Sequence, residues 1–457
     1  MSFSLPVDPA NIRTLVDLDI SYALASTLVT WNEDRQLVSG LAESWEPTSE
    51  KEVAFKIRPS AKWSDGKPIT AQEVVKSLHR AKKAHGDALK SLYDNVTSIE
   101  AKEPSIVVFK LTGEVGATGI VQKLTEPMYG VVALKPDGSP DVSKTTGPFV
   151  VKSASETEIV LQQNEHWISR RENMPKMVSI RRSQSTIGAL LNDPWPNLVG
   201  SMSLQTDTSA AEIAKAKYQI WRRSLDKVFF LAAGPQATNA DGRSLIQFIQ
   251  KNLDRGVVTR GLNGFNLTDQ FFPPGCVLFD PDFKRQESSV VLPEKFKKRA
   301  IEILTFEPFM SSVLLDNVKA ALKAAAGVPP VVRSVPLGDL EKYRVEGKYD
   351  LLLAALPVND PNIDGSVGFF FGLTPSIIPN AGDGQKDFAA RVKAARKLAT
   401  QTERNAVYRK VLTDAAQSGS IAPIFHYSTM VIAKDGIDLS QVPTTDETVA
   451  FAKVQFK

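Results

Sequence analysis

The chain has 457 residues, which exceeds what one hydrophobic core ordinarily accommodates, so two or three domains are expected. Its content of 42% hydrophobic and 23% charged residues is typical of a soluble globular protein. The 55 Lys and Arg residues outnumber the 51 Asp and Glu residues by only four and are scattered, so composition gives no reason to expect nucleic-acid binding. The single cysteine, Cys276, excludes an intramolecular disulfide and argues against a Cys-based metal site.

No stretch of the chain reaches the run of about 18 apolar residues that predicts a membrane span. The chain also does not open on a charged segment followed by an apolar one, which is the pattern of a secretory leader. The sequence therefore predicts no membrane-spanning helix and no leader at its first residues.

The first strong local signal is a strand, a turn and a capped helix. Val53, Phe55 and Ile57 alternate with polar or small residues, which is the period of a strand with one buried face. Asp65 and Gly66 predict a turn, since glycine accepts a positive φ. Thr70 stands three residues before Glu73, the spacing of a capping box, so a helix is expected to begin at Ala71.

Further elements alternate between strand and helix along the rest of the chain. Ser209 with Glu212, and Ser244 with Gln247, have capping-box spacing and predict two more helix starts. The polar, turn-rich segment 239–242 predicts a linker. The other predicted elements are strands at 106–111, 149–153, 158–162 and 349–356, helices at 312–326, 387–400 and 402–418, and a returning strand segment at 421–433. Two blocks of alternating strands and helices indicate two α/β lobes.

The segment Trp63 to Val74, which reads WSDGKPITAQEV, closely resembles the signature of extracellular solute-binding protein family 5, the peptide- and nickel-binding receptors of ABC importers. Further segments resemble the same family in the same order. These segments are Asp8-Pro9, TGPF from Thr146, NEHW from Asn164, Arg243 to Arg255, Val318 to Val332 and Glu403 to Phe425. Together they span nearly the whole chain.

The resemblance implies an α/β fold with two lobes, the type II, cluster C periplasmic binding protein fold, with an extra small domain inserted in the N-terminal lobe. On this basis lobe I is expected to comprise 1–39, 146–238 and 421–457, the extra small domain 40–145, and lobe II 239–420. Two crossovers between the lobes are expected to act as a hinge. Proteins of this family are exported, so Met1-Ser2 is expected to stand in place of a removed leader.

A search of the sequence for catalytic and cofactor motifs finds none. It contains no phosphate-binding G-x-x-x-x-G-K-[ST] or G-x-G-x-x-G pattern and no G-x-S-x-G nucleophile turn. His79 and His85 stand six residues apart, which does not suit a zinc-binding helix. The expectation is a protein without catalytic activity and without a cofactor.

Candidate ligand-binding residues are polar and aromatic side chains near the crossovers and at the carboxyl ends of buried strands, where α/β proteins bind ligands. The N-terminal part of the chain supplies two candidates, and the later strands supply five. The candidates are Tyr22, Trp31, Asn359, Asp360, Phe425, His426 and Tyr427. The alternative for each of them is a place in the hydrophobic core.

One departure from the family bears on the ligand. Aligned on Asp360-Pro361, the strand of peptide-binding members runs into a motif whose first Asp pairs with the free amino group of the peptide. In this chain that position is Pro357, and the family's Trp position is Ala354. Burying an ammonium without its carboxylate partner is expensive, so the usual peptide anchor is missing unless Asp360 or Asp364 substitutes for it.

The sequence thus predicts a receptor that captures a small solute in an interlobe cleft by hinge closure and delivers it to the permease subunits of an ABC importer. A peptide is the first choice of cargo, and a metal chelate, sugar or other small organic molecule is the alternative. A second alternative is a receptor-derived sensor or scaffold without a ligand. The expected protein is a monomer that binds no nucleic acid and is periplasmic or lipid-anchored at the outer face of the cell membrane.

Overall fold

A computed structural model describes most of the chain. The described residues are 7–10, 15–32, 36–84, 96–113, 117–181, 187–193, 196–201, 210–222, 227–237, 240–262, 265–285, 290–307, 312–336, 339–358, 363–372, 385–398, 400–428, 430–442 and 450–456. Within these ranges no helix combines the length and apolar content that crossing a bilayer requires.

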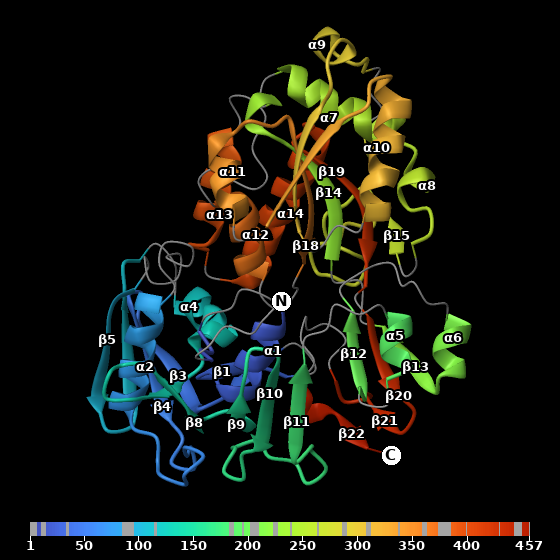
Figure 1. Cartoon of the computed structure of the whole chain (residues 1–457). Helices are drawn as coiled ribbons and strands as arrows, with labels where there is room; N and C mark the ends of the chain where they lie inside the picture. Colours follow the sequence, from blue (N-terminus) through green and yellow to red (C-terminus); the bar gives the residue numbers. More distant parts are fainter. Residues whose placement is uncertain are drawn as a thin grey trace. The chain divides into compact units, whose positions relative to one another are not determined.

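Strands follow one another in runs up to β11 (Met177–Arg181), and helices and strands alternate more regularly after it (Figure 1). The α-helices are α1 (Leu15–Leu24), α2 (Ala71–Ala84), α4 (Ala117–Lys123), α5 (Ile187–Leu191), α6 (Ala210–Lys215), α7 (Ala240–Asn252), α8 (Arg255–Val258), α9 (Glu294–Lys297), α10 (Ser312–Ala326), α11 (Leu340–Glu346), α12 (Ile363–Gly372), α13 (Gln385–Ala395) and α14 (Gln401–Gln417). The strands are β1 (Val29–Trp31), β2 (Leu37–Ser39), β3 (Ala42–Ser49), β4 (Glu52–Ile57), β5 (Val96–Glu103), β6 (Ile106–Leu111), β7 (Val132–Leu134), β8 (Pro140–Thr145), β9 (Phe149–Ala154), β10 (Glu158–Gln163), β11 (Met177–Arg181), β12 (Leu198–Ser201), β13 (Tyr218–Arg222), β14 (Lys227–Ala233), β15 (Phe265–Leu267), β16 (Glu302–Glu307), β17 (Val331–Pro336), β18 (Leu351–Pro357), β19 (Ile421–Tyr427), β20 (Met430–Lys434), β21 (Ile437–Asp438) and β22 (Gln455–Phe456). Short 3-10 turns are η2 (Pro127–Tyr129), η3 (Pro235–Ala237) and η6 (Phe451–Lys453).

Internal contacts divide the chain into two compact units. The first unit comprises Met1–Asn197 and Lys434–Lys457, and the second comprises Leu198–Ala433. This division differs from the boundaries expected from the sequence, which assign β14 and β19 to lobe I. In the structure β14 pairs with β18 on one side and β19 on the other, so all three strands belong to the sheet of the second unit. The three-part division remains a prediction.

The first unit contains a four-stranded antiparallel sheet in the order β3-β4-β6-β5, packed against α2. Val53, Phe55 and Ile57 are its buried residues on β4, as their alternation predicts. Helix α2 begins at Ala71, and both hydrogen bonds of the predicted capping box form: the Glu73 amide donates to Thr70 Oγ1 at 3.3 Å, and the Thr70 amide donates to Glu73 Oε2 at 2.9 Å. These predictions are confirmed.

The second unit is built on a six-stranded mixed sheet in the order β15-β19-β14-β18-β16-β17. Helices α7, α8 and α10 cover one face, and α11, α12, α13 and α14 cover the other (Figure 1). Strand β18 forms close to its predicted position, but it is parallel to β16 and antiparallel to β14, so the sheet is not purely parallel. Helix α10 ends at Gly327, whose φ of 80° is the expected left-handed stop.

Two predictions near residue 240 are wrong. Residues 240–242 of the segment expected to be a linker form the first turn of α7, which begins at Ala240. Ser244 therefore lies inside the helix and does not cap it. An acidic residue, Asp241, stands in the first turn, where it stabilises the positive end of the helix dipole, so its polarity marks a helix start. The predicted cap Ser209 lies outside the described residues.

Candidate functional site

Two of the predicted ligand residues lie together in the first unit. Tyr22 on α1 and Trp31 at the end of β1 both line a cavity of about 200 Å³. Tyr22 is 40% exposed although its helix neighbours Ala23 and Leu24 are buried, so α1 anchors itself by one face and presents the phenol ring on another. The structure thus brings together two side chains that are separate in sequence.

Hydrogen bonds fix the orientation of Trp31. Its indole Nε1 donates to Thr125 Oγ1 at 2.9 Å, and that hydroxyl in turn donates to the Gln122 carbonyl at 2.7 Å. The polar edge of the indole is therefore satisfied inside the protein. The ring itself is only partly buried and can offer apolar and π contacts to a bound molecule.

Other aromatic residues of this cavity were not among the residues predicted to bind a ligand. Trp167 lines it, and its Nε1 donates to Ser26 Oγ at 3.3 Å. Phe451 lines it from the C-terminal turn η6. Trp167 could have been found, because it belongs to the NEHW segment on which the family resemblance rests. Phe451 gave no signal, because it is remote in sequence and follows residues that carry no motif. Asp19 and Lys453 add one charge of each sign to the lining.

The TGPF segment explains how the cavity wall is built. The Ser26 amide donates to Thr146 Oγ1 at 2.9 Å, and Ser26 Oγ donates to the Thr146 carbonyl at 2.8 Å. A Cβ at Gly147 would lie only 2.5 Å from the carbonyl carbon of Leu24, so only glycine allows this approach to the end of α1. The two following residues, Pro148 and Phe149, then line the cavity.

The candidates on β19 lie in the core of the second unit. Phe425, His426 and Tyr427 are 0%, 0% and 2% exposed. Phe425 stacks on Phe229 with ring centroids 4.6 Å apart and an interplanar angle of 11°. All seven residues of β19 are buried, since helices cover both faces of the strand. In this structure the three residues belong to the hydrophobic core, which was the alternative to ligand binding, and they offer almost no surface to a solute.

His426 has an unusual environment for a titratable group. Its Nε2 donates to the Phe271 carbonyl at 3.1 Å, and its Nδ1 is buried with no hydrogen-bond partner among the described residues. Burial lowers the pKa of His426 to about 4, because a charged imidazolium would lose its hydration there. The side chain is therefore a neutral core residue at physiological pH.

Of the two acids that could replace the usual peptide anchor, the structure describes Asp364, and its carboxylate is already engaged inside the protein. Asn359 and Asp360 lie outside the described residues. Asp364 on α12 is 6% exposed, and both of its carboxylate oxygens are engaged. Arg404 Nε donates to its Oδ2 at 3.1 Å, and Tyr408 donates to its Oδ1 at 2.6 Å. Asp364 therefore holds α12 to α14.

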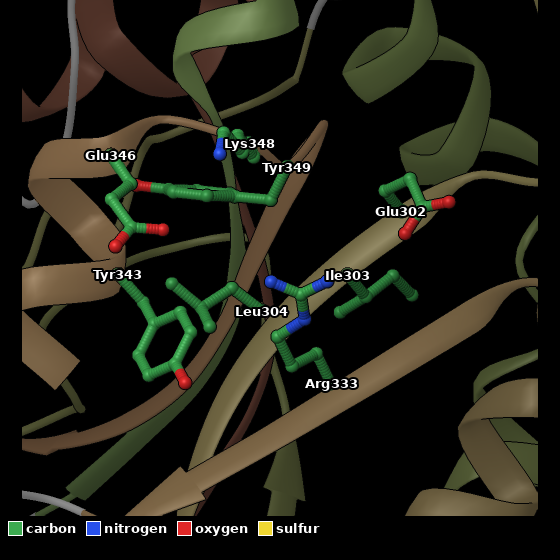
Figure 2. A pocket seen from close by; sticks show the side chains of 8 residues that line it. All are labelled: Glu302, Ile303, Leu304, Arg333, Tyr343, Glu346, Lys348 and Tyr349. Atoms are coloured by element: carbon green, nitrogen blue, oxygen red, sulfur yellow. The ribbon is translucent and has the colours of Figure 1, made fainter. Parts of the chain in front are cut away.

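A second, much smaller hollow lies in the second unit beside β16, β17 and α11 (Figure 2). Its volume of about 10 Å³ is close to the minimum for a single water molecule. Arg333 projects between Tyr343 and Glu302 and lies over the Tyr343 ring at 5.7 Å. The hollow is too small for a solute, so the cavity of the first unit is the better candidate. Among the residues that the structure describes, no group of three His, Cys, Asp or Glu side chains could hold a metal ion.

Comparison with known proteins places the chain in a family. Residues 36–193 match the model of bacterial extracellular solute-binding proteins, family 5. The periplasmic murein peptide-binding protein MppA of Escherichia coli K12 is 36% identical over 74 residues, which are 16% of this chain and 14% of that relative. The aligned segment is thus a small part of the relative's length.

Solved structures match over the whole chain. The structure of NikA from Brucella suis in complex with Fe(III)-EDTA has a TM-score of 0.84, is 16% identical, and the match covers 100% of this chain and 98% of that one. The structure of AgaA in complex with agropinic acid from Agrobacterium tumefaciens R10 has a TM-score of 0.77, is 15% identical, and the match covers 100% and 97%. Over residues 36–193 the chain belongs to the bacterial extracellular solute-binding proteins of family 5, and over its whole length it has the two-lobed periplasmic binding protein fold.

Proposed function

We propose that this protein is the solute-binding receptor of an ABC importer, which captures a small molecule and delivers it to permease subunits. The observation that carries the proposal is the cavity of about 200 Å³ lined by Tyr22, Trp31, Trp167 and Phe451 in a chain of this family. Ligand sites are concave and mostly apolar, with a few polar groups, and this cavity has that composition. It would be the first unit's share of the solute site.

The cavity volume limits what the first unit can hold. Pockets for drug-sized molecules measure about 300–1,000 Å³, and a cavity of about 150 Å³ accepts benzene. A space of about 200 Å³ therefore suits a group the size of one side chain or one sugar ring. The second unit would contact the rest of a larger solute, and closure over the solute would select the loaded form.

A peptide is the first candidate cargo, and MppA is named as a peptide-binding protein. A non-peptide solute is the second candidate, because Pro357 stands at the position of the usual acidic anchor. Asp364 does not replace that anchor, because its carboxylate oxygens accept hydrogen bonds from Arg404 and Tyr408. The structures of NikA and AgaA contain non-peptide molecules, Fe(III)-EDTA and agropinic acid. The open cavity weighs against a ligand-free scaffold, which would fill that space with its own side chains.

The proposal includes no catalytic step and no cofactor. We further propose that it is a monomer and works in the periplasm or lipid-anchored at the outer face of the cell membrane; the periplasmic site is supported by the name of MppA, which is called periplasmic. The relevant partners would be the solute and the permease subunits.

Tryptophan fluorescence tests the proposal, since Trp31 and Trp167 both line the cavity. Addition of a bound solute is expected to change the emission of the wild-type protein. Trp31→Ala and Trp167→Ala should each weaken binding by about tenfold, because each removes a large apolar contact surface worth about 1.4 kcal/mol or more. Trp45→Ala is the matched control, because Trp45 is a partly buried tryptophan of β3 that packs on the sheet core and does not line the cavity. Equal affinity in all three variants would remove the cavity from the solute site.

A further inference from the structure

We propose that the cavity of the first unit, lined by Tyr22, Trp31, Trp167 and Phe451, binds an organic ammonium group of the solute and disfavours a carboxylate or a phosphate. This inference rests on the proposed receptor function and names the chemistry of the part of the cargo that the first unit holds. The lining side chains offer ring faces and acceptors to a solute, because most of their donors are already used within the protein.

Four partly exposed aromatic side chains line this cavity. Tyr22 on α1 is 40% exposed, and Trp31, Trp167 and Phe451 are each partly buried, so every ring leaves surface that a bound group can contact. The face of an aromatic ring is negative and attracts a cation within about 6 Å of the ring centroid, most strongly where the ring is tryptophan. Several such rings around one space recognise quaternary ammonium groups. The cavity therefore has the residue types of a cation-binding site.

The two indole N–H groups of the lining are not available to a solute. Trp31 Nε1 donates to Thr125 Oγ1 at 2.9 Å, and Trp167 Nε1 donates to Ser26 Oγ at 3.3 Å. An indole has a single N–H, so a carboxylate in the cavity receives no hydrogen bond from either ring. The tryptophans instead offer their ring faces, which attract a cation and repel an anion.

Three hydroxyl groups of the lining also donate their only proton within the protein, each to a backbone carbonyl. A hydroxyl that donates elsewhere can only accept a hydrogen bond from a solute. An ammonium group therefore finds acceptors at these three positions, and an anion finds no donor there. The hydrogen bonds run from Ser26 Oγ to the Thr146 carbonyl at 2.8 Å, from Thr27 Oγ1 to the Val29 carbonyl at 2.6 Å, and from Ser39 Oγ to the Glu43 carbonyl at 2.8 Å.

The charged side chains of the described lining do not reverse this preference. Asp19 and Lys453 contribute one charge of each sign, and each already has an interaction partner within the chain. The remaining side-chain donors of the described lining are the hydroxyls of Tyr22, Thr30 and Ser169. A hydroxyl can accept as well as donate, so these three can also serve an ammonium group. Ring faces and oxygen lone pairs therefore decide which charge the cavity prefers.

Both candidate cargoes can carry an ammonium group of suitable size. A peptide has one at its N-terminus, and a non-peptide amine has one without a peptide bond. A cavity of about 200 Å³ has room for an ammonium group with small alkyl substituents, since one of about 150 Å³ accepts benzene. The rest of the solute would extend beyond this cavity.

The test uses three probes of the same shape and different charge. They are choline, its neutral carbon analogue tert-butylethanol, and the anion of tert-butylacetic acid. Each has one methyl signal in its proton NMR spectrum, which is followed as the protein is added. The wild type is expected to bind choline about tenfold more tightly than the alcohol, and the anion least tightly, because only the cation is attracted by the ring faces. The choline methyl signal should move upfield under the ring currents.

Substitutions assign the preference to its source. Trp31→Leu keeps an apolar side chain and removes one ring, so the ratio of choline affinity to alcohol affinity should fall about threefold. Trp45→Leu is the matched control and should leave the ratio unchanged, because Trp45 packs on the sheet core and does not line the cavity. Asp19→Asn should lower the ratio by less than Trp31→Leu does. Melting temperatures verify that the variants are folded, and Trp167→Leu replaces Trp31→Leu if that variant does not fold.

A further pair of probes separates the two sources of the ammonium group. Tighter binding of alanyl-phenylalanine than of its N-acetyl derivative would identify the N-terminus of a peptide. A preference for choline without a difference between the two dipeptides would identify a non-peptide amine. Either result supports the inference.

Other outcomes overturn it. Equal affinity of the wild type for choline and the alcohol, or tighter binding of the anion, would refute an ammonium site and leave the receptor function standing. A ratio that is lost in Asp19→Asn and kept in Trp31→Leu would do the same, because the carboxylate and not the rings would then select the cation. Absence of binding by every probe would also overturn the inference. The receptor function would then be judged separately, by whether the protein purified from its own compartment carries an added mass.

Discussion

Acidification should destabilise the second unit through His426. The imidazole is fully buried in β19, donates one hydrogen bond to Phe271 and cannot take up a proton without losing its hydration, which lowers its pKa to about 4. In the unfolded chain the same group titrates near its ordinary value of about 6.5. Between about pH 4 and pH 6.5 the unfolded state therefore binds a proton at His426 that the folded state does not bind.

The sign and size of the effect follow from this difference. Above about pH 6.5 the imidazole is neutral in both states and its protonation does not change the free energy of unfolding. As the pH falls from about 6.5 towards 4, proton uptake by the unfolded state lowers the free energy of unfolding. With pKa values of about 4 and 6.5, the loss at about pH 4.5 amounts to about 2.5 kcal/mol.

Urea unfolding followed by circular dichroism at about pH 7.5 and 4.5 measures this loss. His426→Gln keeps a donor for the Phe271 carbonyl and cannot be protonated, so its loss on acidification should be smaller than that of the wild type by about 2.5 kcal/mol. His79→Gln is the control for the exchange of histidine for glutamine, because His79 is exposed on α2 and lies in the other unit. Equal losses in the wild type and His426→Gln would refute the reasoning.

Three further predictions concern stability and are measured by urea unfolding at neutral pH. Arg299→Ala should lower the free energy of unfolding by about 3 kcal/mol, because Arg299 donates two hydrogen bonds, at 2.6 and 2.7 Å, to the fully buried Asp350 carboxylate. A loss below about 1 kcal/mol would contradict this. Gly368→Ala should lower the free energy of unfolding by about 1–3 kcal/mol, because the new Cβ would overlap Arg396 Nη2 and displace that side chain; an unchanged midpoint would show that the Arg396 side chain moves without cost. Thr70→Ala should cost about 1 kcal/mol through loss of the cap of α2, and Thr70→Ser should restore most of it.

The local structure of the first unit could be predicted because adjacent residues determine it. The alternation on β4, the turn at Gly66 and the capping box at Thr70 each depend on side chains within a few positions of one another. The start of α7 was mispredicted because Asp241 and Gly242 favour both a linker and a first helical turn. Only packing of the later apolar residues decides between them.

The site could be predicted only in part, because burial depends on neighbours that the sequence does not reveal. The structure brings Tyr22 and Trp31 to one cavity, and their role in ligand binding stays a prediction. Phe425 and Tyr427 were also predicted as ligand-binding residues, yet β19 is a central strand with helices on both faces, and a run of apolar residues looks the same in either setting.

Native mass spectrometry of the protein purified gently from the compartment in which it works tests the receptor function most directly. The account predicts a population with an added small-molecule mass, and it predicts that this population is smaller in Trp31→Ala and unchanged in Trp45→Ala. A series of masses in the range of short peptides would identify a sequence-tolerant peptide receptor, and one discrete mass would identify a single solute. A bare protein mass for the wild type purified in this way would contradict the account.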